Sequence, residues 1–293
     1  MSLEMSFAGG QRRLRFRLRP LLVPPSAEGL FDQGSVIRRV YGDSVCSLGA
    51  GTALLLQLAH PSVAAGVHDH SDYENRPLDR LFGTLFATST VVFGSHDEVE
   101  RIRTVMAGVH ERVVGPAYHA LDPELLCWVN ATLFATAVQL YERLIHPLSA
   151  AELDDFARDS RRVAEVFGCP IEAQPASWPA FESYWRDTVA ELSVSDTARA
   201  VATSLLSGRG LPLRPMWLPS LSAARAVTAA TLPPRIRRQY GLPWRRVDRA
   251  IATTVLGTAS AVLPRLPDRW RQLGPELMRA PRNSHGASSS VAA

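Results

Sequence analysis

Two stretches of the chain carry the residues best suited to chemistry, and the first centres on a histidine. His110 lies beside an apolar stripe at helical spacing, made of Val99, Ile102, Met106, Val109 and Val113. A neutral imidazole on a rigid helix can coordinate a metal, including the iron of a haem group. It can also be a core histidine whose ring nitrogens bond to neighbouring polar groups. The spacing alone favours this second interpretation. Arg103, two turns before His110, is expected to border the same buried face.

The second stretch places two basic and two hydroxyl side chains on one helical face. Arg76, Arg80, Thr84 and Thr88 follow each other at intervals of four residues. An arginine directed toward an apolar interior needs an anion, because an unpaired buried charge is costly. The carboxylate of a bound ligand would serve, as would a protein acid such as Asp79, and the protein acid is the commoner explanation.

Other side chains carry weaker signals. The run His68 to Asp72 contains a His-x-His pair flanked by aspartates, which can bind a metal but has no fixed partner spacing. His60 precedes Pro61 at the end of an apolar stretch, where it either faces a cavity or caps a helix. The sequence motifs of serine hydrolases, zinc proteases, Rossmann enzymes and di-iron proteins are absent.

Cysteine and lysine content narrows the chemistry further. The three cysteines, Cys46, Cys127 and Cys169, share no Cys-x-x-Cys spacing, so we expect neither a zinc site nor a disulfide framework. A reducing compartment fits this pattern best. All 32 basic residues are arginine, and the absence of lysine excludes Schiff-base catalysis and a Walker-type phosphate loop.

The net charge of +4 is distributed unevenly along the 293 residues. Residues 1–19 carry five arginines and one acid, and residues 235–293 carry eleven arginines and three acids. The segment between them has an excess of acids. Basic ends on an acidic body indicate contact with an anionic surface such as a membrane, or termini that are simply solvated. We expect no specific binding of nucleic acid.

The hydropathy pattern is helical almost throughout. Apolar residues recur every three or four positions, and no alternating strand of useful length is evident. With 46% hydrophobic residues the chain can bury a large core, so we predict one large all-α domain. The predicted helices span about 45–60, 77–92, 95–115, 122–144, 149–168, 177–192, 196–206, 220–231, 233–239 and 243–262. A polar loop at 68–72 and a Gly- and Pro-rich loop at 207–219 separate some of them.

The predicted organisation is a basic arm at 1–29, a helical domain at 30–262 and a basic tail at 263–293 that is disordered after Arg282. The uncharged stretch from Val45 to Val67 is long enough for a membrane span, but its Gly, Gln, His and Pro residues favour a buried core helix. No export signal is convincing. We therefore expect a cytoplasmic protein, with peripheral membrane contact through its basic ends.

Several motifs, taken in order, resemble the MpaB-type oxygenases, a family that includes the rubber oxygenases known as latex-clearing proteins. They are LLLQLAHPSVAAGVHDHS at 54–71, PLDRLFGT at 77–84, VHERV at 109–113, LDPELLCWV at 121–129 and GLPW at 241–244. The resemblance covers residues 30–250, and the succession is more specific than any single motif. It implies an all-helical fold enclosing one haem b. It also implies that dioxygen is used to cleave or oxidise carbon–carbon double bonds of isoprenoid-like substrates.

Carried over residue by residue, the resemblance assigns His110 as the proximal ligand of the haem iron. Arg80 and Thr84 match an Arg-x-x-x-Thr element on the distal side of the haem, where they would act in catalysis and cofactor binding. Arg80, together with Arg103, would contact the propionates or bound oxygen. Thr84 would donate a hydrogen bond to an oxygen ligand.

Two positions depart from the family pattern. Gly83 stands where the rubber oxygenases have a lysine that caps the iron, which leaves the sixth position open, with His60 as the first candidate to fill it. Asn130 stands where many relatives have histidine. The favoured hypothesis is a haem-b oxygenase acting on a hydrophobic substrate. The alternative is a non-catalytic helical module that binds an apolar ligand or a membrane surface, which the departures at Gly83 and Asn130 would permit.

Overall fold

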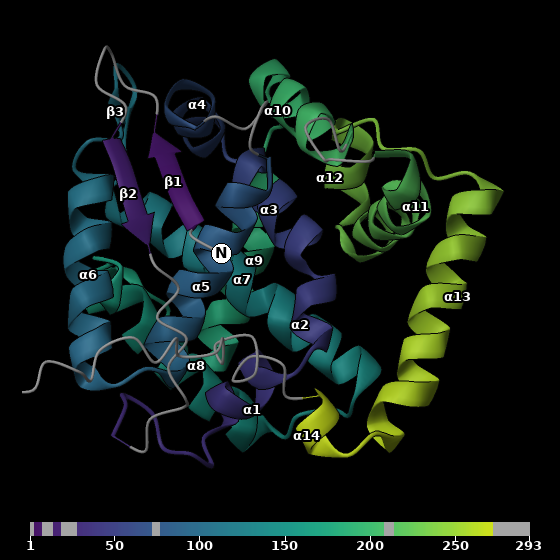
Figure 1. Ribbon diagram of the computed structural model, residues 1–293, viewed down its shortest axis with the longest axis horizontal. Helices are drawn as coiled ribbons and strands as arrows, with labels where there is room; N and C mark the ends of the chain where they lie inside the picture. Colours follow the sequence, from purple (N-terminus) through teal and green to yellow (C-terminus); the bar gives the residue numbers. More distant parts are fainter. Residues whose placement is uncertain (1–2, 8–13, 19–27, 72–76, 208–213, 272–293) are drawn as a thin grey trace, which may run out of the picture.

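The computed structural model describes residues 3–7, 14–18, 28–71, 77–207 and 214–271, and most of this part of the chain is helical (Figure 1). The α-helices are α1 (Val36–Gly42), α2 (Val45–Leu48), α3 (Ala50–Ala59), α4 (Pro61–His70), α5 (Pro77–Phe93), α6 (His96–His110), α7 (Pro123–Leu144), α8 (Ala150–Val166), α9 (Trp178–Glu191), α10 (Asp196–Ser207), α11 (Arg214–Thr231), α12 (Pro234–Gln239), α13 (Arg246–Val262) and α14 (Asp268–Arg271). The 3-10 turns are η1 (Ile171–Ala173) and η2 (Leu263–Arg265). The strands are β1 (Leu3–Phe7), β2 (Leu14–Leu18), β3 (Val114–Gly115) and β4 (Tyr118–His119), which form two antiparallel pairs. The prediction of a single all-α domain is confirmed.

Helices α3 and α7 form the centre of the domain. The longest of the described helices is α7, which is capped by Asp122 and packs against α2, α3 and α8. The buried Trp128 of α7 donates its indole N–H to the carbonyl oxygen of Leu56 in α3 at 3.1 Å. Tyr240, after α12, donates its hydroxyl to the carbonyl oxygen of Leu55 at 2.7 Å. These bonds fix α3 in the core, because a buried donor left without an acceptor is costly.

Helices α5 and α6 pack against each other, with α6 along one edge of the molecule (Figure 1). A capping box starts α6: the Ser95 hydroxyl accepts the backbone N–H of Glu98, and the Glu98 carboxylate accepts that of Ser95 at 2.8 Å. Ser149 and Glu152 form the same box at the start of α8. The predicted helix starts at residues 95 and 149 are confirmed.

Three predicted helix boundaries are wrong. Helix α4 extends through His70, into the predicted polar loop, because Pro61 in its first turn starts a new helix after the break at His60. Helix α6 ends at His110 and not near residue 115, since the residues that follow form the β3–β4 hairpin. Helix α11 begins at Arg214, inside the stretch 207–219 that was expected to be a loop. Residues 208–213 of that stretch lie outside the described residues.

The N-terminal arm also departs from expectation, because β1 and β2 pair in an antiparallel hairpin with Leu3 opposite Leu18. In β2 the apolar residues Leu14, Phe16 and Leu18 alternate with arginines, which is the two-residue period of a strand. The expectation of no strand is therefore wrong here. The alternation was missed because it lies within a stretch dominated by charged residues.

Part of the predicted C-terminal tail packs on the domain. The guanidinium of Arg271, in α14, pairs with the Asp43 carboxylate at 2.8 Å, and the Asp43 side chain is only 1% exposed. The backbone N–H of Ser44 bonds to the carbonyl oxygen of Arg271 at 2.8 Å. These contacts hold α14 at the junction of α1 and α2. The predicted disorder after Arg282 concerns residues outside the described part of the chain.

No single described helix is both long and apolar enough to cross a membrane. Helices α3 and α4 reach that length only as a pair, and they are bent by 105°. In α3 most residues are buried inside the fold, among them Leu55, Leu56 and Leu58. Helix α3 is a buried core helix as predicted, but the stretch from Val45 to Val67 is not a single helix, because it is divided among α2, α3 and α4.

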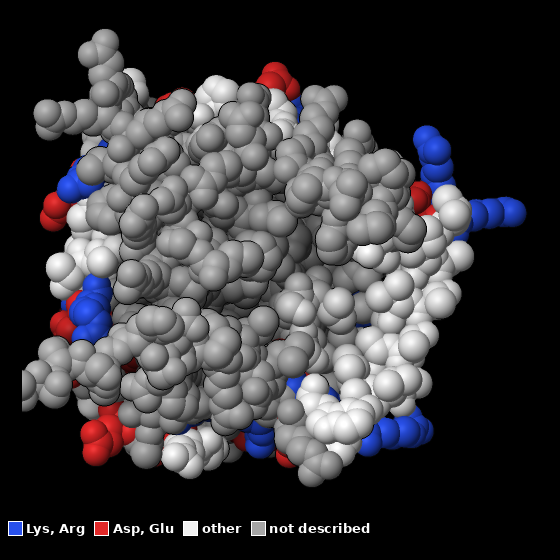
Figure 2. All heavy atoms as spheres, in the orientation of Figure 1, with Lys and Arg blue, Asp and Glu red and all other residues white. Residues whose placement is uncertain are grey.

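Basic side chains project into the solvent at both ends of the edge along which α13 runs (Figure 2). The exposed arginines on α13 and the turns that flank it are Arg245, Arg246, Arg249 and Arg265. Trp270 follows in α14 and is 64% exposed. This edge combines positive charge with an exposed aromatic ring.

Candidate functional site

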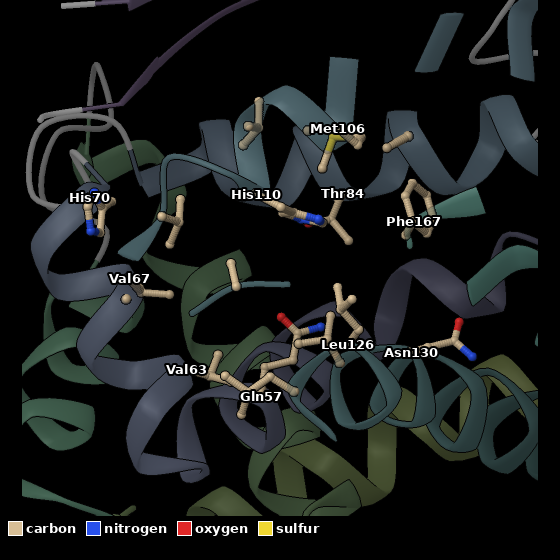
Figure 3. Close-up of a pocket in the computed structure, with 18 of the residues that line it drawn as sticks. Gln57, Val63, Val67, His70, Thr84, Met106, His110, Leu126, Asn130 and Phe167 are labelled. Atoms are coloured by element: carbon tan, nitrogen blue, oxygen red, sulfur yellow. The ribbon is translucent and has the colours of Figure 1, made fainter. Parts of the chain in front are cut away.

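A largely apolar cavity of about 240 Å³ lies among α3, α4, α5, α6 and α7, with the end of α8 contributing to its wall (Figure 3). Its lining residues are Gln57, Ser62, Val63, Gly66, Val67, His70, Ser71, Gly83, Thr84, Ala87, Thr88, Met106, Val109, His110, Val113, Tyr118, Ala120, Leu125, Leu126, Val129, Asn130, Leu133, Ala164 and Phe167. None of these described lining residues is an aspartate, glutamate or arginine. A bound molecule would therefore meet an apolar wall with a few polar groups, as in most small-molecule sites.

His110 projects into this cavity from the last position of α6 (Figure 3). Met106 and Val109, which belong to the predicted apolar stripe, line the same wall. The carboxyl end of a helix carries a partial negative charge, so an imidazole at that end is favoured when it is bound to a cation. The prediction that His110 faces the interior is correct, and its neighbour Val109 is buried.

Helix α5 places two of the residues predicted at four-residue spacing, Thr84 and Thr88, on the wall of the cavity. Gly83 and Ala87 line the cavity beside them. Figure 3 shows Thr84 on the same side of the cavity as His110. Arg80 belongs to the same helix, one turn before Thr84, but its side chain lies outside the described part of the structure.

Gln57, in the middle of α3, is a site residue that the sequence analysis missed. It is 3% exposed, and its amide points into the cavity from the side opposite His110 (Figure 3). The available signal was a single amide within the otherwise apolar run LLLQLA. A buried amide must make hydrogen bonds, so its presence in a core helix favours a role at a polar contact.

The cavity is elongated, with His70 at one end and Asn130 and Phe167 at the other (Figure 3). Near the first end, the Tyr118 hydroxyl donates a hydrogen bond to the Asp69 carboxylate at 2.7 Å. Desolvation and this hydrogen bond raise the pKa of Tyr118 to about 12, which keeps the phenol protonated. At the other end, the Asn130 amide lies 3.3 Å from the Ser160 hydroxyl of α8. Both ends of the cavity thus carry polar groups, and Gln57, Thr84 and His110 are the polar groups between them.

Two predicted site residues lie outside the cavity. Arg103 is exposed and pairs with Glu100 at 3.2 Å, because the cavity touches α6 only from Met106 onward. The expectation that Arg103 borders the buried face is wrong. His60 stands between α3 and α4 as the last residue before Pro61, and it is not among the lining residues.

The environment of His60 nevertheless disfavours its charged form. Its Nδ1 atom is buried and has no hydrogen-bond partner among the described residues. Burial lowers the pKa of His60 from its ordinary value of 6.5, and the nearby Glu124 and Asp122 carboxylates oppose this only in part. The surroundings of His60 at the helix break therefore favour its neutral imidazole.

A cluster of protein ligands for a bare metal ion does not occur among the described residues. They contain no group of three or more His, Cys, Asp or Glu side chains with suitable placement. The His-x-His pair does not converge, since His68 is exposed whereas His70 lines the cavity with Nε2 at 3.2 Å from the Val114 carbonyl oxygen. A single imidazole such as His110 suits a metal whose other ligands come from a prosthetic group.

Comparison with known families decides the family assignment. Residues 38–262 match the model of the family described as "ER-bound oxygenase mpaB/B'/Rubber oxygenase, catalytic domain". The chain belongs to this family. The matched range includes every helix that lines the cavity, so the cavity lies within an mpaB/rubber oxygenase catalytic domain. The family resemblance seen in the sequence motifs is confirmed.

Relatives of this mpaB/rubber oxygenase domain include two uncharacterised mycobacterial proteins. One from Mycobacterium tuberculosis is 28% identical over 209 residues, which cover 67% of this chain and 80% of the relative. The figures are the same for one from Mycobacterium bovis. No solved structure matches the chain at a comparable level of significance.

Proposed function

We propose that this member of the mpaB/rubber oxygenase family is a haem-b-dependent oxygenase, with His110 as the axial protein ligand of the iron. The observation that carries the proposal is the placement of His110 and Gln57 on opposite sides of one apolar cavity (Figure 3). A rigid imidazole faces the space on one side, and a neutral hydrogen-bonding amide faces it on the other. His110 would hold the iron of a bound haem, and Gln57 would offer a hydrogen bond to a polar molecule in the cavity.

The residues present fit a haem group. The porphyrin ring is apolar, and Val67, Met106, Leu126 and Leu133 supply apolar contacts in the wall. Imidazole is a common axial ligand, and the lining residues offer no competing thiolate or carboxylate. The negative propionates need cationic partners, and Arg80, one turn before Thr84 on α5, is the residue proposed for that role.

When bound, haem would bind and activate dioxygen. The chain would orient the substrate, donate hydrogen bonds and limit the access of water to the cavity. The Thr84 hydroxyl and the Gln57 amide can each donate a hydrogen bond to a polar ligand in the cavity. The apolar residues of α4 and α7 exclude water from the same space, which strengthens those hydrogen bonds. These two side chains are therefore the proposed polar contacts of an oxygen ligand.

We propose that the substrate is hydrophobic and elongated, with a carbon–carbon double bond such as an isoprenoid carries. The support is the family's description as rubber oxygenase together with the shape of the cavity, which extends from His70 to Phe167 (Figure 3). Val63, Leu126 and Leu133 offer the apolar contacts that such a chain needs. Burial of apolar surface then provides the binding free energy.

The test is haem binding by the purified full chain after expression with an adequate haem supply. We expect a stoichiometric Soret band that shifts on reduction with dithionite and again with carbon monoxide. His110→Ala should lose this band while its helical circular dichroism persists. The matched control is His96→Ala, at the exposed start of the same helix, which should keep the band.

An unchanged Soret band in His110→Ala would overturn the ligand assignment. Wild-type protein that folds but binds no haem, and binds an apolar fluorescent dye in the cavity instead, would favour the non-catalytic helical module. The dye signal should then fall when Leu126 is replaced by a charged residue, because Leu126 lines the cavity.

We propose a second, separate property from the basic edge along α13. Arg245, Arg246 and Arg249 are exposed together at the start of this helix, and Trp270 is exposed in α14. Cationic side chains attract anionic lipid headgroups, and an exposed aromatic ring favours the membrane interface. This combination supports peripheral contact with an anionic membrane.

A further inference from the structure

The structure brings together two cysteines that are distant in sequence. Cys127 lies in the first turns of α7, and Cys169 follows the end of α8. Both are free thiols, 5% and 1% exposed, and they share a small buried cluster with Leu126 and Ala164. Their side chains pack in the same buried contact between the start of α7 and the end of α8. Sequence spacing alone gave no indication of this pair.

The position of Cys169 is fixed by the way α8 ends. Gly168 adopts a φ of 95°, a left-handed conformation that glycine tolerates best. The backbone N–H of Gly168 bonds to the Glu165 carbonyl oxygen and that of Cys169 to the Ala164 carbonyl oxygen, which is a Schellman motif. This turn directs Cys169 toward the start of α7, where its sulfur lies 3.7 Å from the Pro123 carbonyl oxygen.

The environment of Cys127 favours its thiolate. Interactions with Cys169 and Tyr184 lower the pKa of Cys127, against the opposing effect of burial. The contact with Cys127 and burial raise the pKa of Cys169, which favours its protonated thiol. These opposite directions favour a nucleophilic sulfur on Cys127 beside a protonated thiol on Cys169, as in reactive dithiols.

A second, small cavity reaches Cys127. Its volume is about 20 Å³, enough for one water-sized molecule, and it shares Asn130 with the main cavity. Polar side chains of Asn130, Ser160, Arg161 and Gln174 line it together with Cys127. A small polar molecule in this space would contact the sulfur and find hydrogen-bond partners.

We propose that Cys127 is an oxidation site for hydrogen peroxide, and that Cys169 resolves the product into a reversible Cys127–Cys169 disulfide. The Cys127 thiolate attacks one peroxide oxygen, the O–O bond breaks, and the departing hydroxide takes up a proton to leave as water. This forms a sulfenic acid on Cys127. The Cys169 sulfur then attacks the Cys127 sulfur, and the S–OH group leaves as a second water with the Cys169 proton. Two thiols are oxidised while one peroxide is reduced to two waters.

The disulfide would act on one end of the main cavity. It ties the segment after α8 to α7, and these two segments contribute Phe167 and Asn130 to that end of the cavity (Figure 3). Asn130 also lines the small cavity beside Cys127. The disulfide is therefore expected to restrain this wall of the folded cavity. It also closes a long loop in the unfolded chain, which raises the stability of the fold.

The experiment treats the purified full chain with one equivalent of hydrogen peroxide, blocks free thiols with a maleimide, and maps the peptides by mass. After tryptic digestion we expect a disulfide between peptides 113–143 and 163–186, with Cys46 alone carrying the label. The link should disappear after treatment with dithiothreitol, and the thermal midpoint of the oxidised protein should exceed that of the reduced protein. These readouts concern thiols and do not depend on the proposed haem site.

Three variants sharpen the test. In Cys169→Ser, the sulfenic acid on Cys127 has no resolving thiol and should be trapped by a dimedone-type reagent at that residue. Cys127→Ser should give no link to Cys169 and no trapped sulfenic acid. The matched control is Cys46→Ser, which removes the third thiol and should still form the Cys127–Cys169 link. Three free thiols after peroxide treatment, or a link that involves Cys46 in the wild-type chain, would overturn the proposal without requiring any variant to fold.

Discussion

Gln57 and His110 face each other across the same cavity, one from the centre of α3 and the other from the end of α6 (Figure 3). The two helices are held in this relation by separate contacts. The hydrogen bonds of Trp128 and Tyr240 fix α3 in the core, and the Ser95 capping box starts α6. An amide and an imidazole are thus placed on either side of one apolar space.

The first prediction concerns Gln57. In haem-loaded protein, Gln57→Leu should keep the Soret band but weaken the binding of a hydrogen-bonding iron ligand such as cyanide about tenfold. The reason is that a hydrogen bond to a charged partner contributes about 1.5–3 kcal/mol. Cyanide titration followed in the Soret band measures this change. Gln139→Leu is the control, since that amide bonds to the Thr231 carbonyl oxygen at 3.3 Å and does not line the cavity.

A second prediction concerns the open position beside Thr84. Gly83 is buried and lines the cavity, and it has no side chain to reach the iron. Ferric wild-type protein should be high-spin and should bind imidazole readily, whereas Gly83→Lys should become six-coordinate and low-spin. Gly83→Ala should resemble the wild type and be more stable by up to about 1 kcal/mol, because alanine favours a helix. A low-spin wild-type spectrum that does not respond to imidazole would contradict an open position.

A third prediction concerns the stability of the fold at mildly acidic pH. Burial lowers the pKa of His60 in the folded protein below its ordinary value of 6.5. The unfolded chain therefore takes up a proton at a pH where the folded protein does not, and the free energy of unfolding falls as the pH drops below 6.5. This fall ends once the pH is below the folded-state pKa.

Urea titrations of wild type and His60→Gln at several pH values measure the effect of His60. The variant should lose less stability than the wild type between pH 7.5 and pH 5, because glutamine does not titrate. His96→Gln, at an exposed histidine, is the control and should keep the wild-type slope. Equal slopes for His60→Gln and wild type would show that His60 is solvated when charged.

The fourth prediction concerns the basic edge along α13. The double variant Arg246→Glu, Arg249→Glu should reduce flotation with anionic vesicles at low salt, because exposed charge attraction is screened over about 8–10 Å near physiological ionic strength. The same charge change at Arg101 and Arg158, two exposed arginines on other helices, should have a smaller effect. Deletion of residues 1–19 should also reduce binding. Equal flotation with neutral and anionic vesicles would refute the electrostatic interpretation.

Local signals in the sequence were sufficient for most of the helices. The Ser95 and Ser149 capping boxes and the Asp122 cap act within a single turn, so their effect does not depend on the rest of the fold. The apolar stripe before His110 likewise predicted which side of α6 is buried. The strand pair in the basic arm was missed, since pairing between β1 and β2 is not a local property.

The sequence by itself determined the helical class, the family and the placement of His110 beside the buried face of its helix, because these follow from periodicity, capping and an ordered set of motifs. Only the tertiary structure decided which groups meet. Gln57 and His110 line the same cavity, and Cys127 and Cys169 lie in the same buried cluster. The two residues of each pair are far apart along the chain. Arg103, two turns from His110, is left in solvent beside Glu100. Helical spacing fixes the direction of a side chain on its own helix, but the packing of other helices decides whether a cavity lies there.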